Sequence, residues 1–248
     1  MKIGIIGAGA IGGTLARKLL EAGHEIRISN SRGIEGVRAF ADEIGAKPSG
    51  IYGAVEGADV IVLSIPLPAV AALPSDLFAR VPDGTPIVDT NNYYPGFRDP
   101  QIAQLDDGML ESVWVSQQIG RPVIKAFNNV FASTLKNLGL DPAAAGRLAV
   151  AVAGDDREAK ETVMSLVNQV GFDPVDGGAL DESWRQQPFT PSYCCDYDAD
   201  TMIRALAAAI KGQSASKLGS FGEKYMRLGP NPNHDEIVAI MRSLNSFE

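Results

Sequence analysis

Three glycines near the start of the chain have the spacing of a phosphate-binding turn. Gly7, Gly9 and Gly12 form a G-x-G-x-x-G pattern between the apolar run Ile3–Ile6 and a helical pattern. The first glycine permits a tight turn, the second lets a pyrophosphate approach the backbone, and the third lets the helix lie close to the strand. The helix then offers free N–H groups and a positive dipole. The pattern predicts nucleotide binding by Gly7, Ala8, Gly9, Ala10, Ile11 and Gly12.

The end of the second predicted strand distinguishes between two dinucleotides. An NAD site carries an acidic residue about 20 residues after the glycines, where it binds the ribose 2′-hydroxyl. Here the chain reads Ser29-Asn30-Ser31-Arg32, without an acid. A guanidinium suits a 2′-phosphate, since arginine makes charge-assisted hydrogen bonds to phosphate. We therefore expect Ser29, Asn30, Ser31 and Arg32 to bind NADP(H). The alternative is that Arg32 is a solvated loop residue.

Further candidate residues follow the other predicted strands. In an open α/β sheet, ligands bind beyond the carboxyl ends of the strands. A proline follows the run Val60–Ile65, and a pair of asparagines stands shortly after each of the runs 86–89 and 122–126. Asparagine also forms loops, which is the alternative interpretation. We expect contacts with the ribose and nicotinamide from Ser64, Ile65, Pro66, Asn91 and Asn128.

Groups for acid–base or metal chemistry are scarce. His24 and His234 stand at a turn and at a predicted helix start, where surface or capping roles are expected. The sequence suggests no Ser/His/Asp arrangement and no cluster with metal-ligand spacing, so no metal is expected. Lys125 ends a predicted strand and is the one candidate for a proton relay, with packing and loop support as the alternative. The catalytic residue is otherwise unknown.

Length and charge restrict the class of protein. The 248 residues suffice for one large domain, or for one domain with a small appendage. There are 22 basic and 30 acidic residues, for a net charge of −8, which argues against nucleic-acid binding. We expect a cytoplasmic protein without a membrane partner, because no apolar run approaches the ~20 residues of a span and the first residues indicate a strand rather than a signal peptide. The adjacent Cys194 and Cys195 are expected to be reduced thiols.

Alternating strands and helices must position these groups. In the segment 10–22, apolar residues recur at every fourth position, as in a helix packed on a sheet. The alternation predicts an α/β fold with a Rossmann-like, doubly wound parallel sheet. Strands are expected at 3–6, 25–29, 60–65, 86–89, 122–126, 147–153 and 172–175, and helices at 10–22, 35–44, 75–81, 109–119 and 155–170. A loop is expected at 66–68, and a capping-box-like pair, Asp155 and Glu158, is expected to begin the last of these helices.

The strand pattern stops after Gly177-Gly178, which is the best candidate for a domain boundary. We expect an NADP-binding Rossmann domain at 1–178 and a small, mainly helical C-terminal domain at 179–248. One helix is predicted around 202–210 and another after the cap Asn233. The glycine- and serine-rich stretch 212–222 is expected to be a connection.

The order of these motifs resembles a known enzyme family over about residues 1–178. The segments 7–12, 29–33, 89–92 and 123–129 follow one another as in the NADP oxidoreductases related to coenzyme F420-dependent NADP reductase. The resemblance implies that Ser31 and Arg32 contact the 2′-phosphate, that 8–11 lie under the pyrophosphate and that 64–66 flank the nicotinamide. It also implies direct hydride transfer to a deazaflavin ring, with positioning rather than an obligatory catalytic acid.

The acceptor stays open, because the segment 183–195 departs from the family pattern. Its aromatic residues Trp184, Phe189 and Tyr193 either stack on a flat ring or pack at a domain junction. The favoured function is hydride transfer between NADP(H) and a small-molecule redox acceptor of the deazaflavin F420 or flavin type. The alternatives are a β-hydroxyacid dehydrogenase-like enzyme that uses Lys125 and a non-catalytic NADP(H)-sensing protein. A homodimer is expected on frequency alone.

Overall fold

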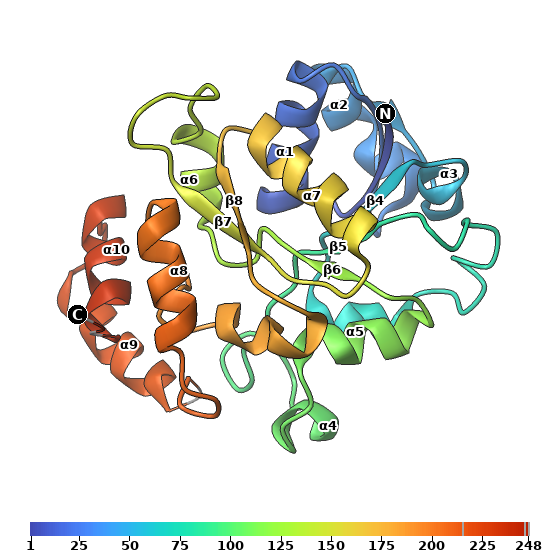
Figure 1. The fold of residues 1–248 in the computed structure, drawn as a ribbon. Helices are drawn as coiled ribbons and strands as arrows, with labels where there is room; N and C mark the ends of the chain where they lie inside the picture. Colours follow the sequence, from blue (N-terminus) through green and yellow to red (C-terminus); the bar gives the residue numbers. More distant parts are fainter. Residues whose placement is uncertain (215, 246, 248) are drawn as a thin grey trace.

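Short runs of isoleucine and valine form the sheet at the centre of the molecule. The computed structural model describes residues 1–214, 216–245 and 247 (Figure 1). Six parallel strands lie in the order β3-β2-β1-β4-β5-β6, which confirms the predicted Rossmann-like sheet. This order brings the carboxyl ends of β1, β2 and β4 together. The strands are β1 (Lys2–Ile6), β2 (Glu25–Ser29), β3 (Lys47–Pro48), β4 (Val60–Leu63), β5 (Ile87–Asp89) and β6 (Ile124–Lys125).

Two more strands extend the sheet beyond β6. β7 (Ala149–Val152) and β8 (Asp173–Asp176) pair in parallel with each other. Reciprocal backbone hydrogen bonds of 2.8 and 3.0 Å join Lys125 to Ala153, next to β7, in antiparallel fashion. The last two strands therefore run against the other six.

Helices cover both faces of the sheet, as the nearly continuous apolar strands require. On one face α1 (Ala10–Glu21), α2 (Gly33–Ile44) and α7 (Arg157–Gln169) pack over β1 and its neighbours. On the other face α3 (Ile51–Val55), the 3₁₀ helix η1 (Leu67–Ala72) and α5 (Glu111–Ile119) complete a second core. The short helices α4 (Ala103–Asp106) and α6 (Ala132–Asn137) lie in the connections around α5 and β6.

The C-terminal region is helical, as predicted. It contains the 3₁₀ helix η2 (Leu180–Gln186), α8 (Ala199–Ala208), α9 (Lys217–Arg227) and α10 (His234–Ser243). α8 packs on β7 and β8, while Figure 1 shows α9 and α10 beside it at one end of the molecule. Asn233 caps α10 in a capping box with Glu236, which confirms the predicted cap.

The prolines after β4 begin a helix, so the prediction of a loop at 66–68 was wrong. Pro66 is the N-cap of η1 and Pro68 lies in its first turn, where the missing N–H has no helical partner in any case. Leu67 and Val70 are buried under this helix. The helix predicted at 75–81 is a series of turns instead.

Two other local predictions were wrong. The N-cap of α7 is Asp156, whose carboxylate accepts from the Ala159 N–H at 2.8 Å, whereas Asp155 accepts from the Leu180 N–H at 2.8 Å and fixes the start of η2. The expected connection at 212–222 contains most of α9. The two glycines of α9, Gly219 and Gly222, have no described neighbour within 4 Å of an added Cβ. They therefore lie in an exposed helix, which tolerates glycine.

Candidate active site

The glycine turn between β1 and α1 has the geometry that its spacing predicts. Gly7 has a φ of +111°, and a Cβ added there lies 2.0 Å from the Ser64 carbonyl oxygen. A Cβ added at Gly12 lies 2.1 Å from the Gly7 oxygen. At Gly9, no heavy atom of the described residues lies within 4 Å of an added Cβ. The amino end of α1 therefore opens onto unfilled space, where an anion can reach the backbone.

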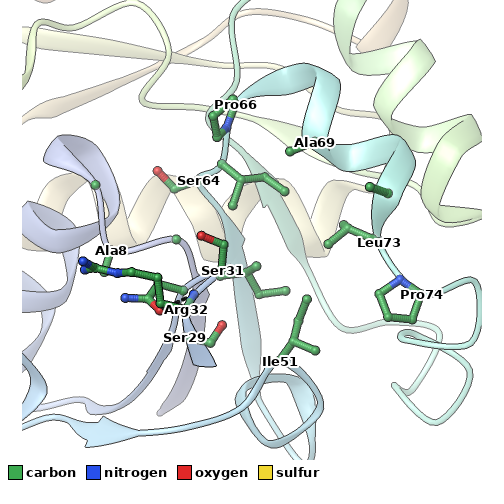
Figure 2. Close-up of a pocket in the computed structure, with 16 residues that line it drawn as sticks. Ala8, Ser29, Ser31, Arg32, Ile51, Ser64, Pro66, Ala69, Leu73 and Pro74 are labelled. Atoms are coloured by element: carbon green, nitrogen blue, oxygen red, sulfur yellow. Dashed lines mark hydrogen bonds between the residues drawn. The ribbon is translucent and has the colours of Figure 1, made fainter. Parts of the chain in front are cut away.

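A cavity of about 610 Å³ joins this turn to the ends of β2 and β4. Figure 2 shows Ser31 and Arg32 on the side of the glycine turn and the apolar Ile51, Leu73 and Pro74 opposite them. The lining residues, all in the described part of the chain, include no carboxylate. A polar, cationic side and an apolar side suit a phosphorylated ribose and an adenine ring, respectively.

The residues at the end of β2 and directly after it have two different roles. The Asn30 side chain donates to the Gly36 oxygen at 2.9 Å and accepts from the Arg32 N–H at 2.9 Å, which holds the loop against α2. Ser29 is buried, and its hydroxyl lies 3.4 Å from the Ile5 oxygen. Ser31 and Arg32 are exposed at the cavity. The Arg32 guanidinium donates to the Gly36 oxygen at 3.3 Å, which leaves its other N–H groups and the Ser31 hydroxyl for a phosphate.

A second cavity of about 340 Å³ adjoins the first and shares Gly9 and the segment 64–66 with it. Asn91 lines it and is 4 % exposed, and neither atom of its carboxamide finds a hydrogen-bond partner in the described chain. A buried amide without partners is costly, which indicates a ligand that supplies a donor and an acceptor. The other lining residues include Ala10, Ile11, Asn92, Tyr94, Arg98, Asn128 and Tyr193.

A buried ionic cluster lies behind Asn91. Lys125 is fully buried and donates to the backbone oxygen of Asn91 at 2.5 Å. Its Nζ also lies 3.3 Å from Asp89 Oδ2 and 3.4 Å from Glu111 Oε2. Asp89 also accepts from the Ser112 hydroxyl at 2.6 Å. The three protons of the ammonium therefore have three acceptors, and neither cavity lining contains Lys125 among the residues described. This arrangement favours the packing role.

Glu111 in this cluster predicts a pH dependence of stability. Burial, opposed by the charge of Lys125, raises the pKa of the Glu111 carboxyl from 4.5 to about 7. Between these values the folded protein keeps a proton that the unfolded chain releases, so a rise in pH favours unfolding. We expect the Glu111 contribution to the unfolding free energy to fall by about 3 kcal/mol over this interval. Denaturant titrations of wild type and Glu111→Gln from pH 4.5 to 7 measure it. An identical slope in both proteins contradicts the prediction.

Neither histidine is among the lining residues of the two cavities. His24 Nε2 contacts the Gln169 side chain at 2.7 Å. His234 lies 3.0 Å from the Ser133 hydroxyl through Nδ1 and 2.6 Å from Asp196 through Nε2. The sequence-based expectation of no Ser/His/Asp arrangement was therefore wrong, because these three residues are far apart in the chain. The series links α10 to α6, and the two cavity linings as described contain none of the three.

Tyr94 and Arg98 are among the lining residues of the second cavity that the sequence did not indicate as site residues. Tyr94 meets Tyr193, which lies 99 positions later, through their hydroxyl groups. No local pattern in the sequence indicates that Tyr94 and Tyr193 are in contact. The one available signal is the aromatic loop after β5, which contains Tyr94. Among the residues that the structure describes, no group of three His, Cys, Asp or Glu side chains could hold a metal ion. No described helix has both the length and the apolar character needed to cross a membrane.

The parallel sheet and its central glycine turn define an NADP-dependent oxidoreductase of the Rossmann class. A family model described as NADP oxidoreductase, coenzyme F420-dependent, matches residues 2–93, and the chain belongs to this family. The Escherichia coli (strain K12) protein YjhV is 53 % identical to it over 100 residues, which are 40 % of this chain and 73 % of YjhV.

Two solved structures have similar folds. The hypothetical protein SMa0349 from Sinorhizobium meliloti is 32 % identical, with a TM-score of 0.61, over 75 % of this chain and 89 % of that one. A candidate F420-dependent NADP-reductase from Arthrobacter sp. FB24 is 22 % identical, with a TM-score of 0.59, over 74 % of this chain and 87 % of that one. The second likeness shows the fold alone.

Proposed function

We propose that this chain transfers hydride between NADP(H) and a second redox carrier of the deazaflavin F420 or flavin type, or another small acceptor. One observation carries the proposal: two adjoining cavities meet over the glycine turn and the segment 64–66. The first, with its polar and apolar sides, is assigned to the adenosine and pyrophosphate. The second is assigned to the nicotinamide and its acceptor.

The residues present fit this cofactor. The open space at Gly9 admits the pyrophosphate, and the unpartnered amide of Asn91 matches the carboxamide of a nicotinamide. Bound NADPH supplies the hydride. In this proposal Ser31 and Arg32 hold the 2′-phosphate, and Asn30 positions them. The remaining contacts come from Gly7, Ala8, Ala10, Ile11, Gly12, Ser29, Ser64, Ile65, Pro66 and Asn128.

Arg32→Ala is expected to raise the Kd for NADPH about 10- to 100-fold while changing the Kd for NADH less than about twofold, because one charge-assisted pair is worth about 1.5–3 kcal/mol. Fluorescence titration with both dinucleotides measures this. Arg38→Ala is the matched control, since Arg38 also lies on α2 but pairs with Glu35. A wild-type protein that prefers NADH, or equal losses for both dinucleotides in Arg32→Ala, contradicts the 2′-phosphate site.

The acceptor is identified by a stopped-flow screen. Coenzyme F420, a flavin, neutral carbonyl compounds and imines are each mixed with protein and NADPH, and the loss of reduced nicotinamide absorbance is followed. The family description and the name of the Arthrobacter protein support F420. A protein that binds NADPH tightly but consumes none with any acceptor is a sensor rather than an enzyme.

Three wider expectations remain proposals. We place the boundary between the NADP-binding domain 1–178 and the helical domain 179–248 at Gly177-Gly178, where limited proteolysis tests it. We also propose a cytoplasmic homodimer, which sedimentation velocity and cell fractionation test.

A further inference from the structure

Two tyrosines meet in the second cavity. Tyr94 comes from the loop after β5, and Tyr193 from the segment after η2. Their hydroxyl groups are hydrogen-bonded to each other, and both side chains line the cavity together with Asn91. The pair therefore lies where the acceptor is expected to bind. A hydroxyl at that position can take part in the reaction if its proton is free.

An amide network supplies the tyrosine pair with a hydrogen-bond donor. Asn92 Nδ2 donates to the backbone oxygen of Asn128 at 2.9 Å, while Asn92 Oδ1 accepts from Asn128 Nδ2 at 3.0 Å, so the Asn92 amide has one orientation. The same Nδ2 lies 3.4 Å from the Tyr193 hydroxyl oxygen and donates to it. Either tyrosine hydroxyl can donate to the other. In one of these two orientations Tyr193 accepts from Asn92 and gives its own proton to the oxygen of Tyr94.

In that orientation the hydroxyl proton of Tyr94 has no partner. Its oxygen accepts from Tyr193, and the described part of the chain offers its proton no acceptor other than Tyr193. A ligand with an acceptor atom in the cavity stabilises this orientation by accepting the Tyr94 proton. The series of hydrogen bonds then runs from Asn92 through Tyr193 to Tyr94, and each bond strengthens the next.

Two neighbours of Tyr94 offset part of the cost of the anion that remains after donation. Burial is the main cause that raises the pKa of Tyr94, and Cys194 and Glu111 act in the same direction. The hydrogen bond from Tyr193 and the charge of Arg98 oppose this, and the guanidinium carbon of Arg98 lies 4.6 Å from the centre of the Tyr94 ring. Tyr94 therefore stays protonated at neutral pH, yet its phenolate has a donor and a cation beside it.

We propose that Tyr94 is the catalytic residue that protonates the acceptor, an inference that depends on the proposed hydride transfer. The Tyr94 O–H bond breaks and a bond forms between this proton and the nitrogen or oxygen of a C=N or C=O group. That atom holds the electron pair of the double bond once hydride has reached the neighbouring carbon or, in a deazaflavin, the carbon at the far end of the conjugated double bonds. The phenolate, which accepts from Tyr193 and has the Arg98 guanidinium over its ring, then takes a proton from solvent after the product leaves. Tyr193 is a positioning residue.

Tyr94→Phe separates proton donation from hydride transfer. A neutral acceptor found in the screen needs both, whereas an N-alkyl iminium cation takes hydride without a proton. We expect kcat/KM for the neutral acceptor to fall at least about 100-fold, in the range for general acids, and for the cation to change less than about threefold. The NADPH Kd is expected to stay unchanged, while the Tm is expected to fall by a few degrees because the buried Tyr193 hydroxyl loses its partner. Tyr225→Phe, which alters an exposed hydroxyl on α9, is the matched control.

A spectroscopic measurement tests the contact itself. In the dead-end complex with NADP⁺ and a neutral carbonyl acceptor, donation from Tyr94 lowers the carbonyl stretching frequency in Raman difference spectra, and this shift is lost in Tyr94→Phe. Equal slowing of neutral and cationic acceptors, or an unshifted carbonyl in wild type, overturns the donor role while hydride transfer stands. A wild-type protein that binds NADPH and reduces neither acceptor overturns the proposed function, and the role of Tyr94 with it.

Discussion

Gly9→Ala is expected to weaken NADPH binding and leave the fold intact, whereas Gly7→Ala is expected to disrupt the fold itself. Gly9 has a φ of −77°, which alanine adopts without strain, and its added methyl enters space that the described residues leave empty. We propose that the pyrophosphate crosses the amino end of α1 in that space. A misfitting methyl there is expected to raise the Kd roughly 10- to 100-fold, equivalent to about 1.4–2.8 kcal/mol.

Gly7→Ala provides the contrast. Its φ of +111° is unfavourable for a side chain, and the new Cβ lies 2.0 Å from a backbone oxygen that belongs to the neighbouring strand. We expect a loss of more than about 3 kcal/mol of unfolding free energy. Calorimetric titration with NADPH and denaturant unfolding of both variants measure the two effects. Wild-type affinity in Gly9→Ala contradicts the proposed path of the pyrophosphate.

The predictions that succeeded concern features encoded within a few residues. The turn at Gly7 follows directly from a strand, a glycine spacing and a helix that are adjacent in sequence. The location of Ser31 and Arg32 is a similar case, because these residues need only the strand before them to line the cavity, while their binding of a phosphate stays a prediction. Local sequence also specified the cap Asn233, whose partner Glu236 stands three positions later.

The remaining features depend on contacts that no local pattern contains. Tyr94 and Tyr193 lie 99 positions apart, and only the packing of the segment after η2 against the loop after β5 brings them together. The series Ser133–His234–Asp196 has the same origin. The structure at Pro66 and Pro68 was ambiguous for a different reason, because proline both interrupts and begins helices. Here the two prolines begin η1, in which Leu67 is buried.

The buried cluster behind Asn91 shows why Lys125 was an attractive but ambiguous candidate. Lys125 stands at the carboxyl end of β6, on the edge of the sheet where ligands bind, so its position alone fits either catalysis or support. The structure adds that its ammonium is surrounded by Asp89, Glu111 and the Asn91 oxygen. Loss of the Lys125 ammonium is therefore expected mainly to lower the unfolding free energy. An effect on the unpartnered carboxamide of Asn91 is expected to be secondary.

Lys125→Met is expected to cost about 3–5 kcal/mol of unfolding free energy, because it leaves the fully buried Asp89 carboxylate without a cation. Lys125→Met/Asp89→Asn is expected to recover part of this loss. Lys47→Met, which breaks an exposed pair with Glu25, is the matched control and is expected to cost at most about 1 kcal/mol. Denaturant unfolding of the three variants measures these differences. A lysine that acts as an acid–base group predicts the opposite pattern, with turnover lost and the unfolding free energy of Lys125→Met no lower than that of Lys47→Met.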